Sequence, residues 1–173
     1  MTGLVQDLLL LARSDAGQLS LNLAPVSLPD IVQDAADSLP HAPHAPIEIE
    51  IAGTDGVVRG DYEHLRRLFL NLLENAVRHT PADGRIDVTI EKRADQVTAR
   101  VRDTGSGIAP EHLPHIGQPF YRADAGRNRK YGGAGLGLAI CSSISAAHHA
   151  SLKIESAPGR GTTVTVTFPI ARG

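Results

Sequence analysis

Within the stretch Tyr131 to Leu138 of this 173-residue chain, four of the six residues at positions 132–137 are glycines. A predicted helix over 139–149 follows. So few side chains allow the amide groups to close around an anion, and the helix adds the positive end of its dipole. The cluster therefore predicts a phosphate cradle. It lacks the Lys-Ser or Lys-Thr of a P-loop and the spacing of the dinucleotide fingerprint. Because most isolated glycine clusters are turns, this interpretation depends on residues elsewhere.

Asp103 is a second candidate, because it ends an alternating stretch and is followed by Thr-Gly-Ser-Gly-Ile. An ionised carboxylate only accepts hydrogen bonds, so it suits the exocyclic amine of adenine and disfavours the oxygen that guanine presents there. Gly105 and Gly107 would let the backbone close over a flat ring. Without these glycines, a solvated turn aspartate would be the simpler interpretation.

A predicted helix over 61–80 carries polar residues next to its apolar stripe. At ~100° per residue, Asn71, Asn75 and Arg78 form one row, with His79 between this row and the core. The predicted core residues are Leu65, Leu68, Phe69, Leu72, Leu73 and Ala76. Each polar residue alone would commonly be a plain surface residue, and their shared row makes them candidates at the rim of a site.

No periodicity is visible from His115 to Gly133, a stretch that carries Arg122, Arg127, Arg129 and Lys130. A loop of this length inside a compact domain commonly has a function, such as a lid over a ligand. A run of charges is otherwise more often a solvated surface.

The remaining patterns predict the elements that position these residues. The first half of the chain predicts a helix over 2–16, a strand over 18–23, a helix over 27–39 capped by Ser27, a proline-rich linker over 40–46, a strand over 47–51 and a turn over 53–56. Further strands are predicted over 85–91, 96–102, 151–155 and 162–169. We therefore expect an α/β sandwich with a mixed sheet of about six strands and three or four helices on one face.

Composition excludes several classes of protein. A net charge of −2, three tyrosines, three phenylalanines and no tryptophan provide neither a basic face nor a stacking platform for nucleic acid. The single cysteine, Cys141, is predicted to be a small buried hydrophobe. The longest apolar run, Leu8 to Ala12, is too short to span a bilayer, so we expect no direct membrane contact from this chain.

Taken in order, these motifs resemble the ATP-binding catalytic domain of bacterial two-component sensor histidine kinases, in the wider group that includes gyrase B, Hsp90 and MutL. The resemblance covers nearly the whole chain and implies the Bergerat ATP-binding fold, mostly antiparallel. Its five boxes are the N box (Asn71 to Ala76), the first glycine motif (Asp103 to Gly107), the F box (Pro119 to Arg122), the second glycine motif (Gly133 to Gly137) and the third glycine motif (Gly159 to Thr163).

The resemblance implies ATP and Mg²⁺ as cofactors and assigns the metal to Asn75, whose neutral oxygen suits this ion. It implies catalytic roles for Asn71, Asn75, Arg122 and Arg127, where the two arginines would grip the γ-phosphate. The implied ATP-binding residues are Asn71, Asn75, Arg78, His79, Asp103, Gly105, Gly107, Ile108, Tyr121, Arg122, Lys130, Gly133, Gly135, Leu136, Gly137, Leu138 and Thr163.

Two departures from the family pattern refine this expectation. Asn71 stands where the ATPase branches carry a glutamate that activates water, so we expect slow hydrolysis. None of the eight histidines is followed by Glu or Asp, as a phosphoacceptor histidine would be. We therefore expect residues 1–17 to be a remnant of the dimerisation helices, residues 18–173 to be the catalytic domain, and the acceptor to lie outside this chain. A helix that simply packs on its own domain is the alternative.

The predicted function is transfer of the ATP γ-phosphate to a histidine of a dimerisation domain, with a response regulator as an indirect partner, at the cytoplasmic end of a larger kinase. Two alternatives share the fold. One is a serine kinase of the anti-sigma-factor kind, and the other is a domain that binds ATP without transferring it.

Overall fold

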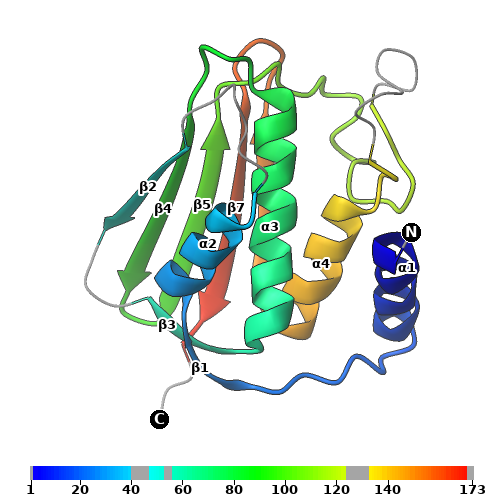
Figure 1. Cartoon of the computed structure of the whole chain (residues 1–173), viewed down its shortest axis with the longest axis vertical. Helices are drawn as coiled ribbons and strands as arrows, with labels where there is room; N and C mark the ends of the chain where they lie inside the picture. The colour runs from blue at the N-terminus through cyan, green and yellow to red at the C-terminus, as the bar shows by residue number, and fades with distance from the viewer. Residues whose placement is uncertain (1, 40–46, 53–55, 124–132, 171–173) are drawn as a thin grey trace.

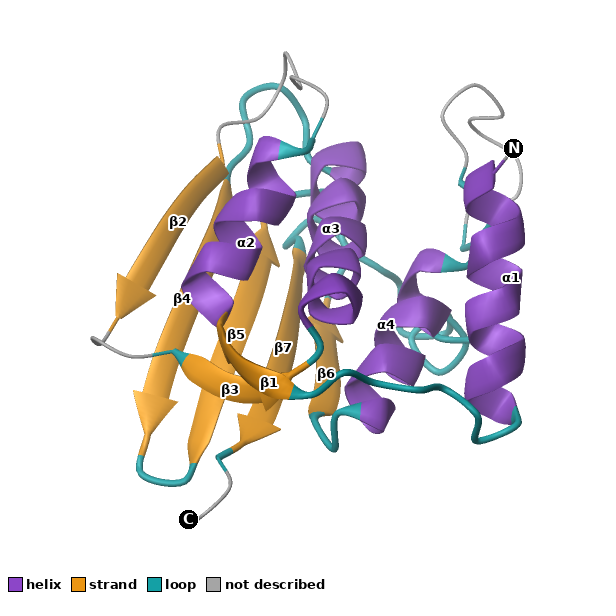
Figure 2. Ribbon diagram, turned by 60° about the horizontal axis from the view of Figure 1, so that its bottom comes forward, coloured by secondary structure: helices purple, strands orange, loops and turns teal. Residues whose placement is uncertain are grey.

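The structure, a computed structural model, describes residues 2–39, 47–52, 56–123 and 133–170. A five-stranded sheet forms one layer, and helices α2, α3 and α4 cover one of its faces (Figures 1 and 2). The helices are α1 (Thr2–Asp15), α2 (Leu28–Asp37), α3 (Tyr62–His79) and α4 (Gly137–Ala147). The strands are β1 (Ala24–Ser27), β2 (Ile47–Ala52), β3 (Val57–Gly60), β4 (Ile86–Arg93), β5 (Gln96–Asp103), β6 (Ser151–Ser156) and β7 (Thr162–Pro169). The predicted sandwich is confirmed.

The main sheet has the strand order β2-β4-β5-β7-β6. β2 runs parallel to β4, and the other neighbours pair antiparallel. Along β5, Val97, Ala99, Val101 and Asp103 are buried, whereas the residues between them are more exposed. Side chains alternate between the faces of a strand, so Asp103 belongs to the face that the helices cover. The sheet thus brings this carboxylate to the helix layer at the end of β5.

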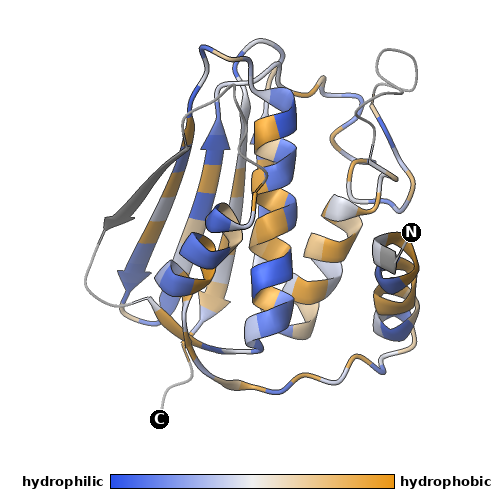
Figure 3. Ribbon diagram, in the orientation of Figure 1, coloured by the Kyte–Doolittle hydropathy of each residue, from blue (hydrophilic) through white to orange (hydrophobic). Residues whose placement is uncertain are grey.

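Helix α3 lies on this face, near the middle of the molecule (Figure 1). Asp61 caps it by accepting a hydrogen bond from the His64 backbone N–H, at 3.1 Å. All six residues predicted for its core stripe are buried: Leu65, Leu68, Phe69, Leu72, Leu73 and Ala76. Figure 3 shows hydrophilic and hydrophobic residues next to one another along α3, as an amphipathic helix requires. The amphipathic pattern therefore fixes which side of α3 remains available for a ligand.

The buried apolar residues form one core, which includes Leu10 and Leu11 of α1. Cys141 is fully buried within it, as predicted, and burial raises the pKa of its thiol. Leu4, Val5, Leu8 and Leu9 of α1 are exposed. No helix in the described ranges is long and apolar enough to cross a membrane.

The prediction of a strand over 18–23 is wrong, and a two-stranded sheet of β1 and β3 takes its place. A strand needs a partner for its backbone groups, but Asn22 N–H donates instead to the Asp61 carboxylate, at 2.8 Å. Residues 18–23 connect α1 to β1 along the bottom of the molecule in Figure 1. Helix α4 starts and ends two residues before the predicted limits. The predicted linker over 40–46 and most of the predicted turn over 53–56 lie outside the described residues.

Candidate functional site

Asp103 is a buried carboxylate with one oxygen already engaged. Its side chain is 7% exposed. Oδ1 accepts hydrogen bonds from Gly105 N–H, at 2.8 Å, and from Thr162 N–H, at 3.2 Å. In the described part of the chain, no hydrogen bond is made to Oδ2. The two amides thus fix the carboxylate and leave its second oxygen as an acceptor for a ligand.

Burial raises the pKa of Asp103 above its usual value, because a charge is costly in a poorly solvated place. The hydrogen bonds from Gly105 and Thr162 and the nearby His79 side chain act in the opposite direction. Hydrogen bonds to the ionised carboxylate offset this cost. A ligand that donates a hydrogen bond to Oδ2 would therefore be favoured at this position.

The glycines around Asp103 permit close backbone contacts that a side chain would prevent. A Cβ on Gly105 would lie 2.3 Å from the carbonyl oxygen of His79, at the end of α3. Gly161 has a φ of +74°, and a Cβ there would lie 1.9 Å from the carbonyl oxygen of Asp103. The loop after β5 is therefore pressed between the end of α3 and the turn before β7. This contact brings the first and third glycine motifs together.

A pocket of about 410 Å³ lies where these segments meet. It is lined by Arg78, His79, Thr80, Pro81, Thr104, Gly105 and Ser106. Three of the predicted site residues, Arg78, His79 and Gly105, are in this lining, and Gly105 bonds directly to Asp103. The pocket thus lies beside the end of α3 and the loop that follows Asp103.

Asn71 and Asn75 face the beginning of α4. A Cβ on Gly137 would lie 3.5 Å from Asn71 Oδ1 and 3.6 Å from Asn75 Nδ2. Asn71 Nδ2 is buried and has no hydrogen-bond partner in the described part of the chain. A buried amide nitrogen without an acceptor is unfavourable, so an acceptor from a ligand would satisfy it. Glu74 is exposed, as its position on the helix predicts.

Arg78 and the backbone of residues 120–121 lie against the second glycine motif. A Cβ on Gly133 would come within 2.8 Å of Arg78 Nη1. Phe120 N–H donates to the Gly135 carbonyl oxygen, at 2.9 Å. Arg122 is exposed. Arg127 and Lys130 lie outside the described residues, so their predicted roles remain predictions.

Thr163 is not brought to the carboxylate by the structure. In β7 the buried residues are Val164, Val166 and Phe168, so Thr163 points to the other face of the sheet. The residue before it, Thr162, supplies the amide that bonds to Asp103. The glycine motif marked this turn correctly, but the strand register decides which threonine reaches the site.

The remaining predicted residues support the site through their backbone or their packing. Ile108 N–H donates to Ser156 Oγ, at 2.8 Å, and Ser156 Oγ donates in turn to the Gly161 carbonyl oxygen, at 2.8 Å. Leu136 is buried next to the start of α4, and Leu138 packs partly against the core. Sequence reasoning missed Ser156, which belongs to none of the five boxes, and it included Thr162 in the last box without giving it a role of its own.

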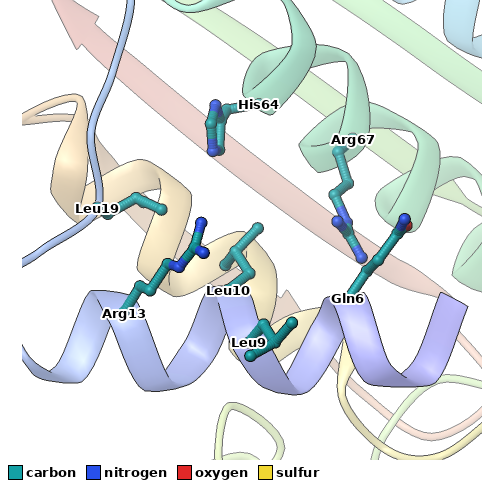
Figure 4. A pocket seen from close by; sticks show the side chains of 7 residues that line it. All are labelled: Gln6, Leu9, Leu10, Arg13, Leu19, His64 and Arg67. Carbon is teal, nitrogen blue, oxygen red and sulfur yellow. The ribbon is translucent and has the colours of Figure 1, made fainter. Parts of the chain in front are cut away.

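Another hollow, of about 210 Å³, lies between α1 and α3 (Figure 4). It is lined by Gln6, Leu9, Leu10, Arg13, Leu19, His64 and Arg67, which come from the two helices and the segment after α1. Arg67 also forms an ion pair with Asp7. None of the predicted nucleotide-site residues lines this hollow. It belongs to the junction with α1 and not to the site around Asp103.

A family model described as histidine kinase-, DNA gyrase B- and HSP90-like ATPase matches residues 60–172. The chain is 37% identical to the sensor histidine kinase RppB of Synechocystis over 173 residues, which cover 98% of this chain and 38% of RppB. It is 34% identical to the signal transduction histidine-protein kinase BaeS of Escherichia coli over 174 residues, which cover 99% of this chain and 37% of BaeS. The chain thus spans less than two fifths of the length of either relative.

Solved structures of histidine kinases are similar to this chain in fold. Full-length ShkA in complex with AMPPNP has a TM-score of 0.83 and 30% identity, over 99% of this chain and 36% of ShkA. The mycobacterial sensor histidine kinase MprB has a TM-score of 0.75 and 26% identity, over 84% of this chain and 97% of that chain. A nucleotide-free catalytic domain of the histidine kinase ThkA, 21% identical with a TM-score of 0.71, supports the fold alone.

Proposed function

Because this chain belongs to the family of histidine kinase-, DNA gyrase B- and HSP90-like ATPases, in which its close relatives include sensor histidine kinases, we propose a phosphotransferase function. The chain would be the ATP-binding catalytic module of such a kinase. It would transfer the γ-phosphate of ATP to a histidine on a dimerisation domain that is not among residues 1–173. In both relatives, more than half of the sequence lies outside the part that matches this chain, which leaves room for that domain.

One observation supports this proposal most directly, the fixed carboxylate of Asp103 with its open Oδ2. Adenine presents an amine that would donate to Oδ2, whereas guanine presents an oxygen at the same place. The neighbouring pocket of about 410 Å³ is lined by Arg78 and by Thr104, Gly105 and Ser106, which follow this carboxylate in the chain. A nucleotide would therefore lie with its base at Asp103 and its phosphates toward Asn71, Asn75 and α4.

The residues at the start of α4 fit a phosphate tail with a divalent cation. The buried Asn71 Nδ2 would donate to a phosphate oxygen, and the first amides of α4 would add their N–H groups. Asn75 would hold Mg²⁺ through its side-chain oxygen, one ligand among phosphate oxygens and waters. When bound, Mg²⁺ would neutralise phosphate charge during transfer. Arg78, which lies against Gly133, would add a positive charge on the same side.

The side chains near the proposed phosphate position favour transfer over hydrolysis. Asn71 and Asn75 face Gly137, and neither amide can take a proton from water. Glu74 is the acidic residue between them in sequence, but it is exposed on another side of α3. We therefore propose that ATP is held and oriented here until an external imidazole is presented to it.

Helix α1 would be the end of a dimerisation helix pair, and residues 18–173 would form the catalytic domain. A response regulator would receive the phosphate from the acceptor histidine, at the cytoplasmic side of a sensor protein. The similarity to sensor histidine kinases supports the proposal of these partners.

The test is a transfer assay with γ-labelled ATP, Mg²⁺ and a separately produced dimerisation domain from the full-length protein. The expected product is a label on that domain that is lost in acid and stable in base, as a phosphohistidine is. A label on an added candidate serine substrate would support the serine kinase instead. Binding of ATP without any transfer would support a nucleotide-sensing domain.

A further inference from the structure

Tyr121 is contacted by two histidines to which the proposed function gives no role. His112 Nδ1 lies 2.7 Å from the Tyr121 hydroxyl, within hydrogen-bond distance. The ring of His115 is centred 5.4 Å from the Tyr121 ring and tilted by 40°, and the ring of His112 is centred 6.1 Å away. One hydrogen bond and one aromatic contact thus orient the phenol.

The two histidines are themselves held by a series of backbone turns. His115 N–H donates to the His112 carbonyl oxygen, at 2.9 Å, and His112 N–H donates to Ala109, at 3.0 Å. Tyr121 N–H donates to the Gln118 carbonyl oxygen, at 3.2 Å. The segment therefore forms a closed unit in which the histidines and the tyrosine have fixed relative positions.

The backbone next to Tyr121 is pressed against the second glycine motif. A Cβ on Gly135 would lie 2.9 Å from the Phe120 carbonyl carbon and 3.0 Å from the backbone carbonyl oxygen of Tyr121. Phe120 has a φ of 67°, in the left-handed region that residues other than glycine rarely adopt. Such a conformation persists only where surrounding contacts enforce it. The contacts of Tyr121 on one side and of Gly135 on the other hold the Phe120 backbone in this conformation.

From these contacts we infer that His112 is a positioning residue of the nucleotide site. It orients the Tyr121 hydroxyl, which holds the 120–121 backbone against Gly135 and so sets the turn that leads into α4 at Gly137. The inference rests on the proposed function, because its effect is on the phosphate end of the bound nucleotide. His115 supports the same tyrosine through its ring.

The test measures the affinity of the whole chain for AMPPNP with Mg²⁺ by calorimetry. His112→Ala and Tyr121→Phe should each weaken binding by roughly 2- to 10-fold, the usual worth of one hydrogen bond. The variant that carries both changes should bind AMPPNP no more weakly than the weaker-binding of the two single variants, because both changes remove the same hydrogen bond. Thermal unfolding of each variant, measured without nucleotide, separates a loss of affinity from a loss of folded protein.

Two conservative variants at one position provide the matched control. His112→Asn places an amide atom where Nδ1 lies and should restore most of the affinity that His112→Ala loses. His112→Gln places its amide one bond further from the backbone and should not restore it. A general requirement for a polar residue at this position would move both variants alike.

Wild-type affinity in both His112→Ala and Tyr121→Phe would overturn the inference, as would equal affinities in the Asn and Gln variants. If His112→Ala does not fold, Tyr121→Phe decides alone, because it keeps the aromatic ring. Failure of the unchanged chain to bind AMPPNP would instead reject the proposed function, and the inference with it. The two failures are therefore distinguishable.

Discussion

At the scale of single residues, Asp103 gives the sharpest prediction, because its two oxygens have different partners. Oδ1 accepts from two backbone amides, so an asparagine at this position must direct its oxygen toward Gly105 and Thr162. The NH₂ group then takes the place of Oδ2 and faces the amine of adenine, donor against donor. Asp103→Asn should therefore weaken ADP binding by about 1–3 kcal/mol, or roughly 5- to 150-fold.

The same exchange should improve GDP binding relative to ADP, since the new NH₂ group can donate to the guanine oxygen. Calorimetry with both nucleotides gives the ratio of the two affinities. Asp95→Asn, at an exposed turn, is the control and should leave the ratio unchanged. An unaltered ratio in Asp103→Asn would show that this carboxylate does not read the base.

His148 predicts an acid-sensitive stability. It is 5% exposed, its Nε2 accepts from Asp61 N–H at 3.0 Å, and its Nδ1 lies 2.7 Å from the Ile144 carbonyl oxygen. Burial lowers its pKa, and the bond to Ile144 opposes that shift only in part. The neutral imidazole already uses both nitrogens, so a second proton would face the Asp61 N–H group.

The sign follows from the lowered pKa. Below about pH 6.5, the ordinary value, the unfolded chain binds a proton at His148 that the folded chain resists, so the free energy of unfolding falls as the pH falls. The facing titratable groups are Asp61, His64 and His149. Burial alone would raise the pKa of Asp61, but its hydrogen bonds from Asn22 and His64 lower it, so Asp61 titrates at more acidic pH.

Urea unfolding at pH 7.5 and 5.5 measures this effect. His148→Gln, which keeps an acceptor but binds no proton, should lose less stability than the wild type between the two pH values. An identical loss in both proteins would assign the acid sensitivity to other groups.

At the scale of elements, a substitution at the start of α4 should change ligand binding without lowering the stability of the fold. A Cβ on Gly137 would make only ordinary contacts, the nearest at 3.5 Å from Asn71 Oδ1, so the fold accepts Gly137→Ala. Alanine favours a helix over glycine by up to about 1 kcal/mol, and the unfolding temperature should stay constant or rise. The new methyl group would nevertheless occupy the gap toward Asn71 and Asn75.

We therefore expect Gly137→Ala to weaken binding of Mg²⁺ and a non-hydrolysable ATP analogue by at least about 1.4 kcal/mol, which is roughly tenfold. Gly105→Ala is the contrasting variant, because its Cβ would lie 2.3 Å from a backbone oxygen and should destabilise the fold itself. Unchanged analogue affinity in Gly137→Ala would remove this part of α4 from the site.

The elements that the sequence predicted well are those with their own periodicity. Helix α3 carries both the core stripe and the polar row, and a single amphipathic pattern places Asn71, Asn75 and Arg78 on one side of it. The strand predicted over 18–23 failed because alternation of Leu19, Leu21 and Leu23 does not supply a pairing partner. β1 and β3 are each four residues long and exist through their pairing with each other. Neighbours distant in sequence decide such strands, and no local pattern contains them.

The site shows the same division. Motifs with many glycines marked where the backbone closes, and Asp103 was identified from its place at a strand end. The choice of Thr162 over Thr163 depends on the register of β7, and the contacts of Tyr121 depend on how residues 109–121 turn. These details arise from contacts between residues distant in sequence, which local sequence patterns do not reveal.

At the scale of the whole molecule, α1 tests how far the core extends. Leu10 and Leu11 are 6% and 8% exposed and belong to the common core, whereas Leu8 on the same helix is 40% exposed. Arg67 of α3 also pairs with Asp7 of α1. If α1 folds and unfolds together with the catalytic body, removing a buried side chain from it must destabilise the entire chain.

Leu10→Ala should therefore lower the free energy of unfolding by about 2–4 kcal/mol, the usual cost of truncating a buried leucine. Leu8→Ala, the matched control, should cost less than about 1 kcal/mol, because its side chain gives up little burial. Chemical denaturation followed by both circular dichroism and the fluorescence of the tyrosines checks whether one transition describes the molecule. Equal small losses in both variants would mean that α1 separates from the body before it unfolds. A single transition, with a larger loss of stability in Leu10→Ala than in Leu8→Ala, would mean that α1 unfolds as one unit with α3, the helix that carries Asn71 and Asn75.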